Sequence, residues 1–199
     1  MTEMPRRLLA CCMLSTLVVA AAPANKFVTD SQCPSNLGKG VKSKREFCDI
    51  AASTDPAKGA SMRIPPHKGA STLRFDLHNR FAVAGKTLPF ARASALVAVL
   101  NANSGAVIDR AAVVNELRAE LDLFDRIIGT GPGGTKTIAP GRPQAATVTI
   151  PASVSAISIV GVRVELTTKA GSEVFSSPGR PVAIVSNLRL EYTPATVGK

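Results

Sequence analysis

The stretch STLRFDL at residues 71–77 alternates apolar and polar side chains from one position to the next. Successive side chains of an extended strand point to opposite faces, so Leu73, Phe75 and Leu77 would share one face and polar residues the other. This period of two is typical of a strand that is buried on one side only. The stretch therefore predicts a half-buried β-strand and indicates that the chain builds a sheet over a core.

Similar short segments recur on both sides of this strand. Residues 60–64 are expected to form its partner, joined to it through the turn formers at 65–69, and the apolar run at 90–102 is expected to be a central strand that enters a turn. Further β-like runs lie at 145–150, 154–160, 162–168 and 181–193, with a hairpin connection at 169–172. Short strands at this spacing predict a mainly β protein, an antiparallel β-sandwich or jelly roll.

One segment departs from the β pattern. Between residues 109 and 128 apolar side chains recur at steps of three and four, with Asp109 placed as an N-cap and Gly129 as a stop. These apolar residues are Val113, Val114, Leu117, Leu121, Phe124, Ile127 and Ile128. The spacing predicts one amphipathic helix at about 109–128. A strand at 106–117 followed by a short helical turn is the alternative, because hairpin context can override a local period.

The first 24 residues have the three parts of an export signal. Arg6 and Arg7 supply the positive start, residues 8–22 supply the apolar centre, and Ala22-Pro23-Ala24 fits the small-residue rule for cleavage. The apolar run is shorter than the roughly 20 residues that a membrane-spanning helix needs. We therefore expect a signal peptide at 1–24 and a secreted or periplasmic protein that does not span the membrane after processing. The sequence leaves the Sec and twin-arginine routes open.

The four cysteines divide into two pairs. Cys11 and Cys12 lie in the apolar centre of the signal and would leave with it. Lipidation of Cys11 is not expected, because most of the apolar run follows it. Cys33 and Cys48 remain, and two exported cysteines most simply form one disulfide.

Composition suggests how the rest of the chain is organised. Residues 25–58 are basic, contain several turn formers and lack a sustained apolar period, which predicts an irregular arm stapled by the disulfide. Hydrophobic residues make up 45% of the 199 residues, enough for a buried core. Residues 59–194 are expected to form a single β-sandwich domain, followed by a short tail at 195–199.

The chain is strongly basic, with a formal net charge of +10 at pH 7, and its basic residues are spread rather than clustered. Such an excess attracts anionic partners through long-range electrostatics. An exported chain with one Tyr and no Trp lacks both the compartment and most of the stacking platforms of a nucleic-acid binder. The spread charge is typical of a solubilising surface, and the alternative is an attraction to an anionic envelope polymer or a glycan. A nucleic acid is not expected.

A glycine-rich loop at 129–137 is the first candidate site. Its candidate ligand-contacting residues, with one arginine that follows the loop, are Gly131, Gly133, Gly134, Lys136 and Arg142. Loop amides and nearby cations can bind an anion together. A nucleotide-binding P-loop, however, needs Lys directly after its closing Gly, whereas here Thr135 intervenes. We expect either an exposed connection or a ligand-contacting loop that does not bind nucleotide.

Two histidines and a carboxylate form the second candidate site. Asp76 and His78 are two positions apart and share one face of the predicted strand, and His67 lies in the preceding loop. This donor set can hold a divalent metal with open positions, so it is the centre of an alternative hypothesis, a small metal-dependent or hydrolytic enzyme. The structural interpretation is a polar network at the strand end, in which Asp76 pairs with Arg80 or His78.

Three motifs resemble a group of secreted bacterial proteins that have no known activity. They are IPPHxG at 64–69, FDLHNR at 75–80 and LFDRI at 123–127, the last before the glycine-rich loop. The resemblance implies a free-standing exported domain and adds no activity, cofactor or catalytic residue. No G-x-S-x-G motif of a nucleophilic serine occurs in the sequence either. We therefore expect a non-catalytic binding or envelope-associated β-sandwich that uses no cofactor.

Overall fold

The structure is a computed structural model, which describes residues 24–83 and 90–195. The signal peptide expected at 1–24, including Cys11, thus lies outside the described residues except for Ala24, as does most of the expected tail. The strands are β1 (Lys26–Val28), β2 (Asn36–Lys39), β3 (Glu46–Ala51), β4 (Ala60–Arg63), β5 (His67–Ala82), β6 (Ala91–Asn101), β7 (Val107–Leu117), β8 (Ile138–Pro140), β9 (Gln144–Ile150), β10 (Ala156–Thr168), β11 (Gly171–Phe175) and β12 (Pro181–Pro194).

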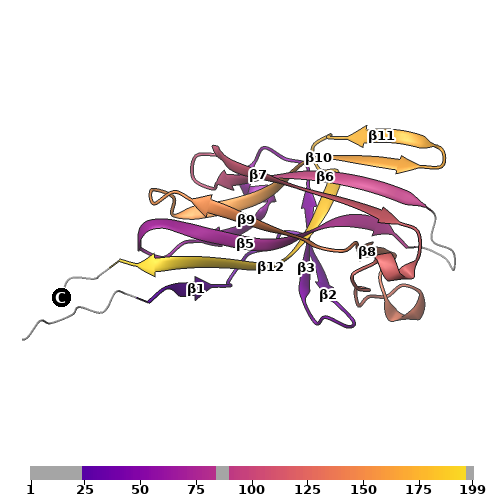
Figure 1. Ribbon diagram of the computed structural model, residues 1–199, viewed down its shortest axis with the longest axis horizontal. Coiled ribbons are helices and arrows are strands. Elements are labelled where there is room, and N and C mark those ends of the chain that lie inside the picture. The colour runs from indigo at the N-terminus through magenta and orange to yellow at the C-terminus, as the bar shows by residue number, and fades with distance from the viewer. Residues whose placement is uncertain (1–23, 84–89, 196–199) are drawn as a thin grey trace, which may run out of the picture.

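These strands form two antiparallel sheets that pack face to face as a β-sandwich (Figure 1). The seven-stranded sheet has the order β2-β3-β12-β5-β8, with β1 beside β12 and β9 beside β5. The five-stranded sheet has the order β11-β10-β6-β7, with β4 beside β10. The mainly β antiparallel fold expected from the sequence is therefore confirmed.

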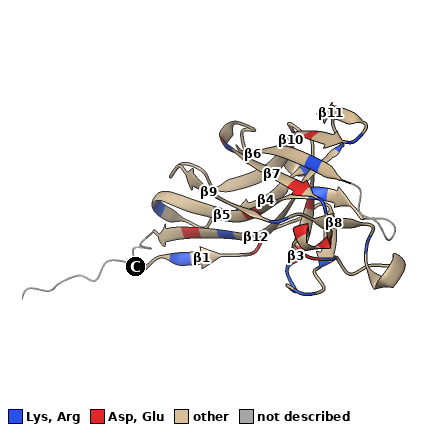
Figure 2. Ribbon diagram, turned by 45° about the vertical axis from the view of Figure 1, so that its right-hand side comes forward, with Lys and Arg blue, Asp and Glu red and all other residues tan. Residues whose placement is uncertain are grey.

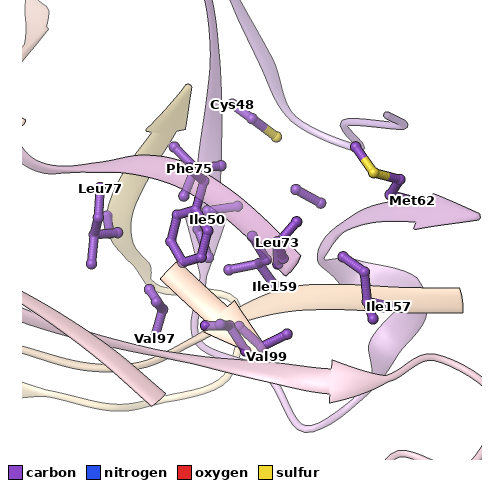
Figure 3. Packing of buried hydrophobic residues seen from close by; sticks show 14 of the residues in the cluster. Cys48, Ile50, Met62, Leu73, Phe75, Leu77, Val97, Val99, Ile157 and Ile159 are labelled. Carbon is purple, nitrogen blue, oxygen red and sulfur yellow. The ribbon is translucent and has the colours of Figure 1, made fainter. Parts of the chain in front are cut away.

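The core lies between the two sheets, where their inward side chains meet (Figure 3). Leu73, Phe75 and Leu77 of β5 are at most 1% exposed, as their alternation predicted. They face aliphatic side chains of β6 and β10, among them Val97 and Ile159. Burying such side chains is the main stabilising contribution to the fold, about 1.5–3 kcal/mol for each fully buried one.

Two of the sequence-based expectations about the strands differ from the structure. Residues 60–64 do not pair with β5, because β4 pairs with β10 in the opposite sheet. The two runs at 154–160 and 162–168 form one strand, β10, with a register shift after Gly161. Gly161 allows the two sheets to approach there, since a Cβ at this position would lie 2.8 Å from the Ala51 carbonyl.

The helix expected at 109–128 is wrong, and the alternative is confirmed. Residues 107–117 form β7, which pairs along its length with β6, and a 3-10 turn follows at Glu120–Asp122. Val113 and Leu117 are buried, at 0% and 1% exposure, and four-residue spacing fits one face of a strand as well as one face of a helix. The strand is favoured over the helix because the backbone N–H and C=O groups along the edge of β6 need hydrogen-bond partners, which β7 supplies.

The N-terminal segment is not an irregular arm. It supplies β1, β2 and β3, and β3 lies inside the seven-stranded sheet between β2 and β12. Phe47 and Ile50 of β3 are each only 1% exposed. The expected disulfide between Cys33 and Cys48 is present, with their Cα atoms 5.7 Å apart, and it ties the loop before β2 to the buried part of β3. Residues 25–58 therefore belong to the sandwich.

A long connection, residues 118–143, crosses the outer face of the seven-stranded sheet, and we call it the strap. Its Ile127 is buried in a cluster with Leu37, Phe47 and Ile184 of that sheet. The carboxylate of Asp125 fixes the strap by accepting the amide of Ser43 at 2.7 Å and that of Lys42 at 3.1 Å. The strap thus closes a smaller apolar cluster, and the ring of His78 on β5 contacts two of its members, Phe47 and Phe124.

Candidate functional site

The two histidines do not meet. His67 begins β5, opposite Pro194, and its Nδ1 contacts the carbonyl of Pro65 at 2.9 Å. His78 lies eleven positions further along the same strand, roughly 35 Å away at about 3.3 Å per residue. Within residues 24–83 and 90–195, no group of three or more His, Cys, Asp or Glu side chains could hold a metal ion. The geometry therefore gives no support to a metal centre at His67, Asp76 and His78.

His78 is instead a buried structural residue. Its Nδ1 lies 2.8 Å from the carbonyl of Gly141 and its Nε2 lies 2.9 Å from the hydroxyl of Ser186. A carbonyl can only accept, so Nδ1 carries the proton and Nε2 accepts from Ser186. Burial lowers the pKa of His78, which keeps the ring neutral near pH 7. The serine and histidine are 2% and 0% exposed, which is typical of a structural hydrogen bond.

Asp76 and Arg80 have partners that the sequence analysis did not name. Asp76 accepts a hydrogen bond from Arg45 at 2.6 Å and one from the Asn187 amide at 3.3 Å. Arg80 pairs through Nε with Asp49 of β3 at 3.3 Å. The charged partners of Asp76 and Arg80 therefore come from β3 and the turn before it, and the expected pairing of Asp76 with Arg80 or His78 is not present among the hydrogen bonds and ion pairs of the described residues.

Asp49 is the least satisfied member of this network. Its Oδ1 is buried and has no hydrogen-bond partner in the described part of the protein. Burial raises the pKa of Asp49, and the charge and hydrogen bond of Arg80 only partly oppose that effect. The ion pair with Arg80 therefore stabilises the charged form of this buried carboxylate.

The glycine-rich loop folds onto itself as a small hairpin. The amide of Gly129 donates to the carbonyl of Gly134 at 3.0 Å, the amide of Gly134 to Gly131 at 3.0 Å, and the amide of Lys136 to Ile127 at 2.8 Å. Gly133, at φ 69°, and Gly134, at φ 72°, make the tight turn, and their side of the loop is exposed. These internal bonds occupy amides that an anion would need.

The two cations next to that loop contact different segments. Lys136 interacts electrostatically with Asp49. The guanidinium of Arg142 donates to the carbonyl of Leu121 at 3.1 Å. Lys136 and Arg142 are therefore not seen to converge on the glycine amides of the loop, as a shared anion site would require.

A feature that the sequence analysis missed lies on β12, where the strand bulges. The register with β5 shifts between Ser186 and Arg189, and Asn187 takes a left-handed conformation with φ 55°. Such bulges often re-aim side chains next to binding sites. A hollow of about 350 Å³ adjoins the bulge and is lined by polar side chains that include Arg45, Asn36 and Asn187.

Beyond the bulge, two arginines face each other across neighbouring strands. Arg189 of β12 lies directly opposite Arg74 of β5, and both are exposed. The guanidinium of Arg189 also lies over the ring of Phe27 of β1, with 5.1 Å between its Cζ and the ring centroid. Phe27 is 55% exposed. We call these three residues, Phe27, Arg74 and Arg189, the arginine platform.

The two arginines of the platform have no carboxylate partner among the described residues. The carboxylates nearest along the two strands have other partners, since Asp76 pairs with Arg45 and Glu191 accepts from the Asn25 amide. Figure 2 shows basic residues on β1 and β12 near the end where the C-terminus lies. Sequence alternation placed Arg74 and Arg189 on polar faces, but only the bulged register brings them together.

Fold and surface together define an antiparallel β-sandwich with a basic platform on the outer face of its larger sheet. No protein-family model matches the chain, and no curated protein matches it either. The described residues contain no helix with the length and apolar character needed to cross a membrane.

Proposed function

We propose that this protein is an exported, non-catalytic binding domain whose arginine platform recognises an anionic envelope polymer, with an acidic polysaccharide as the preferred class. The observation that carries this proposal is the cross-strand pair of Arg74 and Arg189. Like charges directly opposite each other destabilise a sheet. Arg74 and Arg189 face each other without an acidic partner. Binding of an external anion would neutralise their repulsion and would explain why both arginines are present.

The chemistry of the two side chains fits a carboxylate or sulfate group. A guanidinium presents a planar fork of donors that can bind either anion through two parallel hydrogen bonds. Two such forks side by side suit a polymer with repeated anionic groups better than a single small anion, because adjacent groups can bind together.

Phe27 adds an apolar surface next to these charges. Its ring stays more than half exposed while Arg189 covers part of it. An aromatic face of this kind can pack against the apolar face of a sugar ring. The hollow beside the β12 bulge, with Arg45, Asn36 and Asn187 in its lining, supplies further polar contacts for a chain that crosses the platform.

Export is supported by the sequence of the first 24 residues and by the disulfide. Disulfides persist in oxidising compartments, which fits a secreted or periplasmic location. Intact mass of the secreted protein, with and without reduction, tests both points at once. A start at Asn25 and a mass gain of two hydrogen atoms on reduction are expected, whereas an intact leader or a lipid on Cys11 would contradict the location.

The binding test compares anionic polymers with a neutral one, and dextran sulfate and dextran share the same sugar backbone. Polygalacturonate and dextran sulfate serve as anionic ligands and uncharged dextran as the neutral ligand, each titrated at about 20 mM and about 150 mM salt. We expect binding to at least one anionic polymer that weakens at the higher salt, and none to dextran. Equal affinity for charged and neutral polymers, or no binding at low salt, would overturn the proposal.

A matched pair of double variants assigns the binding to the platform. Arg74→Gln with Arg189→Gln removes both platform charges, whereas Arg110→Gln with Arg163→Gln removes two exposed charges from the other sheet. The platform variant is expected to lose about tenfold or more in affinity, the effect of one or two charge-assisted hydrogen bonds. An equal loss in both variants would reduce the interaction to net charge alone.

A further inference from the structure

A separate cleft beside the β10–β11 hairpin is lined by residues of both sheets. The hairpin itself can be followed in Figure 1. The cleft has a volume of about 300 Å³. Its apolar wall comes from both sheets and includes Ala93, Val164, Leu166 and Val182. Ligand pockets in proteins measure roughly 300–1,000 Å³, so this cleft suits a small molecule or the short end of a chain.

Two arginines, Arg80 and Arg180, line this apolar cleft. Arg180 lies with its Cζ 4.3 Å from the centroid of the Phe175 ring, and it has no ion-pair partner among the described residues. Arg80 directs its Nε to Asp49. The lining therefore combines two guanidinium groups with an apolar wall, and the adjacent Asp49 balances only one of the two positive charges.

This combination selects an amphiphile. A carboxylate can accept hydrogen bonds from Arg180 and from the nitrogens of Arg80 that do not contact Asp49, while a hydrocarbon chain covers the wall formed by Val164, Leu166 and Val182. A purely polar anion would leave that wall wet, and a neutral chain would leave the charge of Arg180 without a partner. Phe175 packs against Arg180 and orients it at the cleft.

We propose that this cleft binds a small monocarboxylate with an aliphatic chain. The site is independent of the arginine platform, because it is built from other residues, which come from both sheets. A polysaccharide bound at the platform and a carboxylate bound in the cleft would therefore be separate events on one domain.

The experiment titrates the full mature protein with octanoate, 1-octanol and acetate by calorimetry. Octanoate has both the charge and the chain, whereas each of the other two has one of them. One octanoate per protein is expected, with affinity at least about tenfold higher than that for either control, the scale of one charge-assisted hydrogen bond or of two buried methylenes. No octanoate binding, or equal binding of octanol, would overturn the proposal.

Two single variants locate the bound carboxylate. Arg180→Gln should weaken octanoate binding about tenfold or more, whereas Arg163→Gln, an exposed arginine of β10 that does not line the cleft, should leave it unchanged. Equal affinities in the two variants would contradict the assignment. Thermal melts report whether each variant folds, and if Arg180→Gln does not, the ligand series on the wild-type protein still decides. Polysaccharide binding by Arg180→Gln is expected to stay intact, so failure here is distinguishable from failure of the platform proposal.

Discussion

The ring of His78 on β5 and the hydroxyl of Ser186 on β12, both buried, share a hydrogen bond of 2.9 Å. The other ring nitrogen donates to the carbonyl of Gly141 on the strap. One imidazole therefore joins two neighbouring strands to the segment that covers them. With the ring neutral, Nε2 accepts the hydrogen bond of the serine hydroxyl; a protonated ring would have to donate to the serine oxygen instead.

Acidification is expected to destabilise the protein through His78. Burial lowers the pKa of His78 from 6.5, against smaller opposing effects of the Gly141 carbonyl and the Asp76 charge. The unfolded chain then binds a proton at a higher pH than the folded chain does, so the free energy of unfolding falls as the pH drops below about 6.5. Urea unfolding at about pH 7.5 and about pH 5.5 measures this loss.

A matched pair of variants separates His78 from other titrating groups. His78→Gln is expected to be less stable at both pH values, but with a smaller difference between them. His67→Gln is the control and should keep the pH dependence of the wild type, because the hydrogen bond of His67 to the Pro65 carbonyl lies at the start of β5, away from the contacts that His78 makes with the strap and β12. If both variants keep the full difference, His78 is not the group responsible.

Removing the disulfide is expected to weaken the whole sandwich. The bridge between Cys33 and Cys48 spans 15 residues, and a loop of that length contributes about 3 kcal/mol. Since β3 lies within the larger sheet, the double variant Cys33→Ala with Cys48→Ala should unfold in one transition at lower urea. A second transition confined to residues 25–58, with the rest as stable as before, would show instead that this segment behaves as an arm.

The strands could be predicted from sequence because their signal is local. Alternation identified Leu73, Phe75 and Leu77 as one buried face of β5, and the structure buries all three. The partner of a strand is not a local property, which is why residues 60–64 were paired with β5 although they join β10. The apolar spacing in residues 109–128 fits the period of a helix and that of a strand. Pairing with the edge of β6 makes residues 107–117 a strand.

The site could be predicted less well, for a related reason. Asp76 and Arg80 were expected to pair within the strand end, yet their partners Arg45 and Asp49 come from a segment with no sustained apolar period. The arginine platform depends on the bulge at Asn187, which shifts the register so that Arg189 meets Arg74. Neither the bulge nor the register has a clear signature in the sequence.

Asp125 is expected to control the local stability of the strap. It is 4% exposed and accepts the amides of Lys42, Ser43 and Arg126, so Asp125→Ala leaves three donors without this partner, at a cost of about 1–3 kcal/mol for a donor that stays buried and unpaired. Hydrogen exchange should then accelerate in residues 118–143 more than in β6 and β10. Asp122→Ala, which removes a more exposed carboxylate of the same strap, is the control and should change exchange only near Arg118 and Ala119.

Relieving the charge repulsion at the arginine platform is expected to stabilise the protein. Arg74→Gln removes one of two facing charges and leaves the contact between Arg189 and Phe27 in place. The free energy of unfolding should rise by about 0.2–1 kcal/mol at low salt, and the gain should shrink at about 150 mM salt because screening weakens the repulsion in the wild type. Arg163→Gln, whose cross-strand partner is Leu96, should give no such salt-dependent gain. A variant that is more stable but binds anionic polymer more weakly would link the repulsion directly to binding, whereas a loss of stability in Arg74→Gln at low salt would show that the two arginines are compensated within the fold.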